Sequence, residues 1–505
     1  MHRSFWRSSA AAAARGATPV PSPAASSSSL SSSSSSSCAP LRCAAAASVW
    51  ARCGVAALPL LQQLPMPNHR AGLLRSTPVR LAMNLHASDM STPDRATVHS
   101  ATKKEFKTAL CNELVNKITA QGYYPMSQYI KDCLTHPHHG YYATKKNVIG
   151  SDAADFITAA EIPFFGDVLA AWVMDAWQKM GTPRVLHLVE LGPGRGTLMK
   201  TMLKQIQYSN PHLLHFVQVH LVEVGAARRE EQKAALAEFQ TAQGKIKWWL
   251  DLESLPFSLE PTVFIANEYF DALPVAQFRY TERGWVETCV DVDTDPGTEA
   301  HLRLVHAPSG SMSAYLIPDD VRRSGKAGDS IEVNTVGMQT METILKKMVD
   351  CQKAACLLID YGKDDHMHST LRGIRGHRFV DPLLSPGEVD LSCWVSFRQL
   401  RWALERLEVA RRHLKWFPVM TQRDFLRENG IDIRLAHVIK DEETKSAMKV
   451  LQHYRRLMDV EEMGESYKVF ALQTRNFPNV SPFFAEMPLP PLPQERGAPG
   501  HAGSR

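Results

Sequence analysis

The stretch Val185–Thr197, VLHLVELGPGRGT, decides the fold. It begins with a continuous apolar run of strand length, which is typical of a strand covered on both faces in a parallel sheet. Gly192, Gly194 and Gly196 then occupy alternate positions, where the backbone can turn sharply and a ligand can approach the main chain. Apolar residues follow at the spacing of a helix: Leu198, Met199, Met202, Leu203 and Ile206. The segment therefore predicts a strand, a tight glycine turn and a helix.

The spacing of the glycines differs from that of a dinucleotide-binding loop. The pattern G-x-G-x-x-G would require glycine at position 197, which is Thr197. The observed pattern is E-x-G-x-G-x-G from Glu190, with Pro193 inside it. It is similar to the first motif of class I S-adenosylmethionine-dependent methyltransferases, whose cofactor has a methionyl group and a ribose but no phosphate. A glycine turn without a ligand is the alternative for this motif taken alone.

A second strand candidate, Val217–Val222, ends at Glu223. In doubly wound folds an acid at this point accepts hydrogen bonds from ribose hydroxyls. We therefore predict a cofactor site made of Glu190, Gly192, Gly194, Gly196, Thr197 and Glu223.

Residues 261–266 predict a further strand, followed by Asn267, Glu268 and Asp271. Polar residues just past the carboxyl end of a strand lie where ligands bind in open α/β sheets. These three residues are therefore candidates for the substrate site. A helix N-terminus, which favours acidic residues, is the alternative interpretation.

The N-terminal region has a composition of its own. Residues 1–88 hold eight arginines, no lysine and no acidic residue, among long alanine and serine tracts. This is typical of a mitochondrial or chloroplast transit peptide, with an untargeted low-complexity tail as the alternative. The chain carries +5 in all, so subtracting +8 leaves about −3, which argues against a nucleic-acid-binding body. No stretch is long and apolar enough to suggest a membrane-spanning helix.

Cysteine and histidine spacing does not predict a metal site. The cysteines after the leader show no C-x-x-C spacing: Cys111, Cys133, Cys289, Cys351, Cys356 and Cys393. His136, His138 and His139 are interrupted by Pro137 and Gly140, so a structural turn is favoured over metal binding.

The remaining patterns divide the chain into a leader and linker (1–95), one domain (96–478) and a disordered Pro-rich tail (479–505). Within the domain we expect helices over 106–118, 127–134, 167–180, 228–239 and 336–349, with Ser127 as a cap. A hairpin insertion is expected over 275–305, turning at Arg283-Gly284, with strands over 354–359 and 466–472. Residues 372–391 predict a long ordered loop. Asp155, Thr158 and Glu161 either line a pocket or cap the following helix.

Eight motifs in a fixed order carry a resemblance over roughly residues 103–472. They are MSQYIKDCLTHPHHGYY, DFITAAEIPFFG, VELGPGRGTLM, HLVEV, NEYFDALPV, LLIDYG, RGHRFVDPLLSPGEVDLS and MGESYKVFAL. The sequence resembles the MidA-like family of methyltransferases, which includes the mitochondrial complex I assembly factor 7 methyltransferases. Three positions depart from the family pattern, namely Ala154 for glycine, Ala160 for proline and Ser396 for aspartate.

The resemblance implies a Rossmann-like, class I methyltransferase α/β fold with an N-terminal helical segment and a β-hairpin insertion. It also implies a protein-arginine omega-N methyltransferase of the mitochondrial matrix that uses S-adenosyl-L-methionine. Its implied substrate is a core subunit of complex I, on which an arginine becomes symmetric dimethylarginine. The resemblance also implies that the protein supports the assembly of complex I. A homodimer is an open possibility for its own oligomeric state. Glu268 and Asp271 then become the catalytic candidates, because carboxylates hold a guanidinium, and Asn267 would orient it.

Two other functions compete with this interpretation. A nucleotide-dependent oxidoreductase is disfavoured because Thr197 replaces the third glycine of the dinucleotide motif. A non-catalytic assembly chaperone on a methyltransferase fold is disfavoured because Glu190, Glu223, Glu268 and Asp271 all match the family pattern.

Overall fold

The computed structural model describes residues 107–144, 158–162, 164–240, 245–295, 300–308, 312–440 and 444–488. The expected leader, the positions of Ala154 and Asp155, and the tail from residue 489 lie outside these ranges. Within the described ranges, no helix has the length and apolarity needed to cross a membrane.

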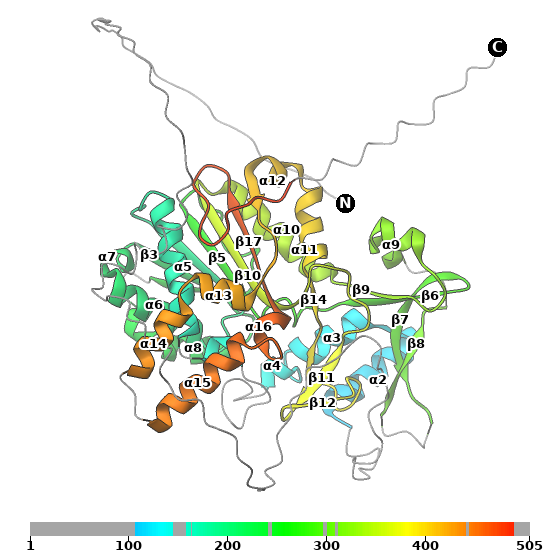
Figure 1. The fold of residues 1–505 in the computed structure, drawn as a ribbon. Coiled ribbons are helices and arrows are strands. Elements are labelled where there is room, and N and C mark those ends of the chain that lie inside the picture. Colours follow the sequence, from blue (N-terminus) through cyan, green and yellow to red (C-terminus); the bar gives the residue numbers. More distant parts are fainter. Residues whose placement is uncertain are drawn as a thin grey trace, which may run out of the picture.

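A nine-stranded sheet forms the centre of the molecule (Figure 1), in the order β15-β17-β10-β5-β2-β3-β4. Five strands run parallel: β2 (Leu186–Leu191), β3 (Val217–Val222), β4 (Ile246–Trp249), β5 (Thr262–Asn267) and β10 (Ala354–Lys363). The antiparallel strands β17 (Tyr467–Thr474) and β15 (Leu414–Trp416) complete one edge. Short strands β14 (Val395–Ser396) and β16 (Met420–Thr421) pair with β10 and β17. The order of the strands reverses between β2 and β5, where ligands bind in such sheets.

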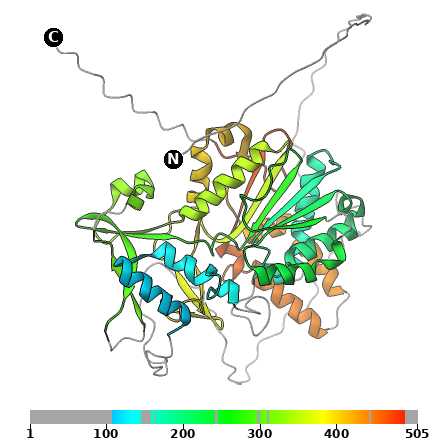
Figure 2. The ribbon, with the colours of Figure 1, turned by 180° about the vertical axis from the view of Figure 1, so that it is seen from behind.

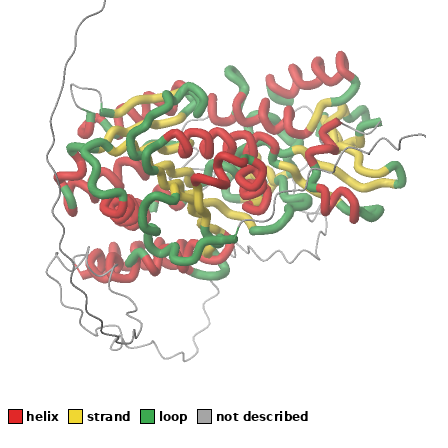
Figure 3. The backbone as a smooth tube through the Cα atoms, turned by 90° about the horizontal axis from the view of Figure 1, so that it is seen from above, coloured by secondary structure: helices red, strands yellow, loops and turns green. Residues whose placement is uncertain are grey.

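Helices cover both faces of this sheet because its strands are apolar on both sides. Along β10, Leu357 and Ile359 belong to one core cluster, whereas Cys356 and Leu358 belong to the other. The first cluster contains α5 (Phe165–Lys179) and α6 (Thr197–Ser209), and the second contains α10 (Thr335–Asp350) and α11 (Phe397–Arg406). The two layers are visible from behind (Figure 2) and from above (Figure 3). This arrangement confirms the predicted α/β fold.

Further helices complete the two layers. The first face continues through α13 (Gln422–Glu428), α14 (Ile431–Lys440), α15 (Thr444–Met458) and α16 (Met463–Ser466). The others are α7 (Pro211–Leu214), α8 (Ala226–Ala235) and α12 (Glu408–His413), with 3-10 turns η3 (Ala159–Glu161), η4 (Ala237–Phe239) and η5 (Met312–Leu316).

A separate five-stranded sheet is formed by four strands inserted between β5 and α10 and by one strand from the N-terminal part of the domain. It contains β6 (Ala276–Thr281), β7 (Gly284–Val292), β8 (Leu302–His306) and β9 (Ser330–Val333), together with β1 (Tyr124–Pro125). The helices α2 (Ala109–Gln121), α3 (Met126–Thr135) and α4 (Tyr141–Thr144) pack beside it. The N-terminal helical segment and the hairpin insertion are thus present. The hairpin turns at Glu282-Arg283, one residue earlier than expected, and Gly284 begins β7 with φ +87°.

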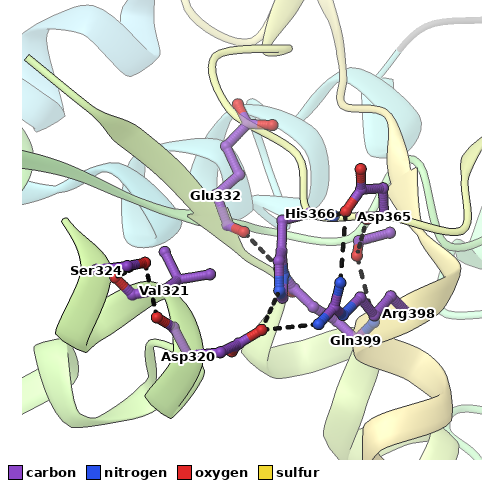
Figure 4. Close-up of polar contacts among 9 residues, drawn as sticks. Asp320, Val321, Ser324, Glu332, Asp365, His366, Arg398 and Gln399 are labelled. Carbon is purple, nitrogen blue, oxygen red and sulfur yellow. Dashed lines mark hydrogen bonds and ion pairs between the residues drawn. The ribbon is translucent and has the colours of Figure 1, made fainter. Parts of the chain in front are cut away.

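A polar cluster attaches the insertion to the central domain (Figure 4). Asp320, on α9 (Asp319–Ser324), accepts a 2.7 Å hydrogen bond from the Arg398 guanidinium and lies 3.5 Å from the His366 ring. Ser396 caps α11 by accepting from the Gln399 amide at 3.2 Å and donates to the Asp365 carbonyl at 2.6 Å. A serine in place of the expected aspartate therefore still caps the helix.

Several local expectations were wrong. Pro125, with no side-chain bond, is the N-cap of α3, and Ser127 lies inside that helix. The segment expected as a loop contains β11 (Arg372–Arg375), β12 (Arg378–Val380) and β13 (Asp390–Ser392). The chain does not leave the core at Pro478, because Val480 and Phe483 are buried in the first cluster.

The histidine-rich turn has a contact of its own. His136 Nε2 and His139 Nε2 lie 3.2 and 3.0 Å from the carboxylate oxygens of Glu113. In the part of the chain that the structure describes, no group of three or more His, Cys, Asp or Glu could hold a metal ion.

Candidate active site

A cavity of about 910 Å³ opens at the carboxyl ends of the central strands. We call one part the glycine side, made of Glu190, Gly192–Thr197 and Glu223, and the other the acid side, made of Asn267–Asp271 and the groups around them. Eight of the nine predicted site residues line this cavity: Glu190, Gly192, Gly194, Thr197, Glu223, Asn267, Glu268 and Asp271. Gly196 does not line it.

The glycine loop uses backbone conformations that favour glycine. Gly192, Gly194 and Gly196 have φ values of +63°, +54° and +81°. A Cβ on Gly192 would lie 2.7 Å from the Tyr269 ring. Gly196 is instead the N-cap of α6, where a Cβ would meet Gln232 at 3.4 Å. The loop is thus shaped both by the cavity and by packing beneath it.

Glu190 has an unpaired carboxylate oxygen that a cationic ligand could satisfy. It lies in β2 and is 2% exposed, and burial raises its pKa to about 8. Its Oε2 has no hydrogen-bond partner among the described residues. Buried polar atoms are normally paired, so this oxygen at the cavity wall points to a ligand group.

Glu223 is held in place at the end of β3. Its Oε1 accepts from the Gly225 amide at 2.7 Å, and its Oε2 accepts from Gln232 Nε2 at 3.2 Å. The same Gln232 amide donates to the Gly194 carbonyl at 2.8 Å. Gln232 therefore joins Glu223 to the glycine loop, a role that no motif in the sequence indicated.

The segment 158–162 forms a wall of the cavity, which favours the pocket interpretation over the helix cap. Thr158, Ala160 and Glu161 line it, and Thr197 Oγ1 donates to Glu161 Oε1 at 2.8 Å. Thr197, which replaces the third dinucleotide glycine, thereby connects the glycine loop to this wall.

Glu268 is the most constrained of the acids. It has a left-handed φ of +49°, which is uncommon outside glycine. Its Oε1 accepts from the Ala159 amide at 2.7 Å, and its Oε2 accepts from the Tyr467 hydroxyl at 3.3 Å. Burial, with a smaller contribution from the charge of Asp271, raises its pKa to about 7. Residues 268–275 form turns before β6, so the helix-terminus interpretation is wrong.

Asp271 and Asn267 complete the acid side. Asp271 Oδ2 accepts from the Ser392 hydroxyl at 2.8 Å, and that hydroxyl also contacts the Tyr361 hydroxyl. Burial raises the pKa of Asp271. The Asn267 side chain is 3.4 Å from Glu268 through its nitrogen, whereas its Oδ1 has no partner in the described structure.

Asp360 is a buried support for this side that sequence reasoning missed. It lies in β10 and is 1% exposed. Its Oδ2 accepts from the backbone amides of Phe270 and Asp271 at 2.9 and 3.2 Å. Burial and the neighbouring charges of Asp271 and Glu268 raise its pKa well above the usual range. The motif LLIDYG contained Asp360 and Tyr361, but only as the end of a strand.

Comparison with known proteins agrees with this geometry. The sequence model of the family described as "Putative S-adenosyl-L-methionine-dependent methyltransferase" matches residues 168–414. A crystal structure of a Burkholderia thailandensis protein bound to S-adenosyl-homocysteine has a TM-score of 0.61 at 24% identity, covering 76% of this chain and 96% of that one. Fold and site therefore define an S-adenosylmethionine-dependent methyltransferase.

Relatives with similar sequences identify a family within this class of methyltransferases. The mouse protein named "Protein arginine methyltransferase NDUFAF7, mitochondrial" is 34% identical over 386 residues, covering 72% of this chain and 84% of its own length. The human protein of the same name is 33% identical, covering 72% and 83%. The chain belongs to this family of methyltransferases.

The cavity fits the cofactor of this class. S-adenosylmethionine presents an ammonium group, a sulfonium and ribose hydroxyls, and the described cavity presents acidic side chains to match them. The unpaired Glu190 oxygen suits a cation, and the Glu223 carboxylate suits hydroxyls, since each of its oxygens can accept a further hydrogen bond.

Proposed function

We propose that this protein is a mitochondrial protein-arginine omega-N methyltransferase that acts on a core subunit of complex I. The observation that carries the acceptor assignment is the pair of half-buried carboxylates, Glu268 and Asp271, in the same cavity as the glycine loop. A guanidinium is a cation that carboxylates bind with strong, directional hydrogen bonds. The names of the curated relatives support the same acceptor.

On the glycine side, Glu190 and the 192–196 backbone would hold the methionyl part of the cofactor. Glu223 would accept hydrogen bonds from the ribose hydroxyls. When bound, the cofactor supplies a methyl group on a sulfonium, which is already a good leaving group.

On the acid side, Glu268 and Asp271 would align the guanidinium, with Asn267 orienting it. Arginine is otherwise always protonated. In the transfer, a guanidino nitrogen would use its lone pair to bond to the methyl carbon while the C–S bond breaks. The electron pair of the C–S bond would remain on sulfur, and the guanidino nitrogen would release a proton. Glu268 would accept that proton, because a carboxyl with a pKa of about 7 suits proton transfer near neutral pH. Alignment of the guanidinium with the methyl donor would supply much of the remaining rate enhancement.

The central test is transfer of a labelled methyl group from S-adenosylmethionine to mitochondrial proteins by the purified chain. Mass spectrometry should find symmetric dimethylarginine on a complex I core subunit. Cofactor binding without transfer to any protein would favour the assembly chaperone instead. Gel filtration with light scattering would decide between a monomer and a homodimer.

The matrix location is a second part of this proposal, supported by the acid-free leader and by relatives named as mitochondrial. Residues 1–90 fused to a fluorescent protein should direct it to the mitochondrial matrix. A cytosolic signal would contradict this part of the proposal and leave the enzymatic part intact.

A further inference from the structure

The segment Arg372–Val380 forms a hairpin whose first strand begins beside the acid side of the cavity. We call it the basic hairpin. Its strand β11 pairs with β12 on one edge and with β13 on the other. In the second pairing Arg372 lies opposite Ser392, and the Ser392 hydroxyl bonds to Asp271. The hairpin is therefore paired with the strand that carries Ser392, the residue that bonds to the Asp271 carboxylate of the proposed substrate site.

The far end of the basic hairpin stands at the mouth of the cavity. His377 and Arg378 are exposed and also line the cavity. Arg378 lies opposite Arg375, three residues along β11 from Arg372. At about 3.3 Å per residue, this end is roughly 10 Å from the level of Ser392. A polypeptide whose arginine reaches Asp271 through the part of the cavity that His377 and Arg378 line would run past this end of the hairpin.

The charges on the hairpin are not all compensated within the protein. Arg375 lies 3.5 Å from Glu388, and Arg372 stacks on the Phe379 ring at 5.0 Å. By contrast, no described carboxylate forms an ion pair with Arg378 or His377. A positive group at the entrance repels an incoming guanidinium, so the arginine-bearing substrate would need a negative charge of its own at this place.

We propose that the basic hairpin, through Arg378, selects arginines that have an acidic residue within about three positions in the substrate chain. This inference rests on the proposed arginine acceptor and deepens it by naming the sequence context. It assigns the Arg378 cation at the mouth to the substrate and not to the cofactor, because β11 of the hairpin pairs with β13, whose Ser392 bonds to Asp271 on the acid side.

The test uses three synthetic peptides with one central arginine and flanking positions that are acidic, amide (Asn and Gln) or lysine. Labelled-methyl transfer gives kcat/KM, and fluorescence anisotropy gives peptide affinity for the cofactor-loaded full chain. We expect the acidic peptide to be favoured about fivefold over the amide peptide, which is the upper range for an exposed ion pair. Raising the ionic strength should reduce that ratio.

The variant Arg378→Glu should reverse the order of the acidic and lysine peptides and leave cofactor affinity unchanged. Arg283→Glu is the matched control: it makes the same charge change on an exposed hairpin turn that does not line the cavity. It should keep the wild-type order of peptides.

Equal kcat/KM and equal affinity for all three peptides would overturn the inference, and so would an unchanged order in Arg378→Glu. Weakened cofactor binding in that variant would assign Arg378 to the cofactor and overturn it as well. Preferential binding of the acidic peptide without methyl transfer would instead contradict the arginine acceptor while leaving the charge selection standing.

Discussion

The glycine side and the acid side of the cavity are built in different ways. On the glycine side, the bond from Gln232 to the Gly194 carbonyl joins residues 38 positions apart. On the acid side, Ser392 bonds to Asp271 across 121 positions, and Tyr467 to Glu268 across 199. One half is a nearly continuous piece of chain, whereas the other is assembled from remote segments. With the roles proposed above, changes on the glycine side should affect cofactor binding, and changes on the acid side should affect methyl transfer.

The largest effect is expected for Gly194→Val. The left-handed φ of +54° strains any branched residue, and the new side chain would occupy the cavity. Cofactor affinity measured by calorimetry should fall at least about 100-fold. Gly284→Val is the matched control, since φ is +87° and a Cβ there meets nothing within 4 Å; it should bind the cofactor normally. Wild-type affinity in Gly194→Val would remove the loop from the site.

Glu268→Gln tests the acid side. It keeps the shape of the side chain and removes both the counter-charge for the guanidinium and the proton acceptor. We expect methyl transfer to fall by about 10²-fold, a typical loss for one transition-state contact, with nearly unchanged cofactor affinity. Transfer at the wild-type rate would show that the acceptor lies elsewhere.

Glu223→Ala should give the opposite ordering. Loss of charge-assisted hydrogen bonds costs about 1.5–3 kcal/mol, so the cofactor dissociation constant should rise roughly 10- to 100-fold. At saturating cofactor, the transfer rate should stay near that of the wild type. If the rate fell while affinity held, the division of the cavity into two sides would be wrong.

Asp360→Asn tests whether a residue that does not line the cavity positions Glu268 and Asp271. Asp360 Oδ1 also accepts from the Tyr361 amide at 2.9 Å, so an asparagine in either orientation places its nitrogen against a backbone donor. This should shift the turn that carries Asp271. We expect kcat to fall about tenfold through lost orientation, with cofactor affinity retained. Asp291→Asn, on the inserted sheet, is the control. Loss of thermal stability with unchanged kcat would give Asp360 a purely structural role.

The smallest expected effect is the number of protons released when the cofactor binds. Because burial raises the pKa of Glu190 to about 8, this carboxyl is mostly protonated at pH 7 without the cofactor. A cationic ligand group beside it lowers that pKa, so binding should release up to about one proton. Calorimetry at pH 7 in buffers of different ionisation enthalpy measures the number, and Glu190→Gln should abolish it. Equal enthalpies in all buffers for the wild type would contradict this role.

Sequence patterns predicted the central fold well because its signals are local. Apolar runs predicted the strands that became β2, β3, β5, β10 and β17, and glycine spacing located the loop between β2 and α6 that lines the cavity. Turn chemistry at Arg283-Gly284 gave the inserted hairpin. Local signals failed where Pro125, and not Ser127, precedes α3. They also failed within residues 372–391, which contain short strands whose formation depends on their pairing partners.

By itself the sequence determined the parallel sheet, the glycine loop, the positions of Glu190 and Glu223, and the acids after β5, since each follows from residues close together in the chain. Only the tertiary structure decided that Ala159, Tyr467 and Ser392 bond to those acids and that Asp360 supports their turn. These contacts join buried groups far apart in sequence, and no local periodicity encodes which remote hydroxyl or amide meets a given carboxylate.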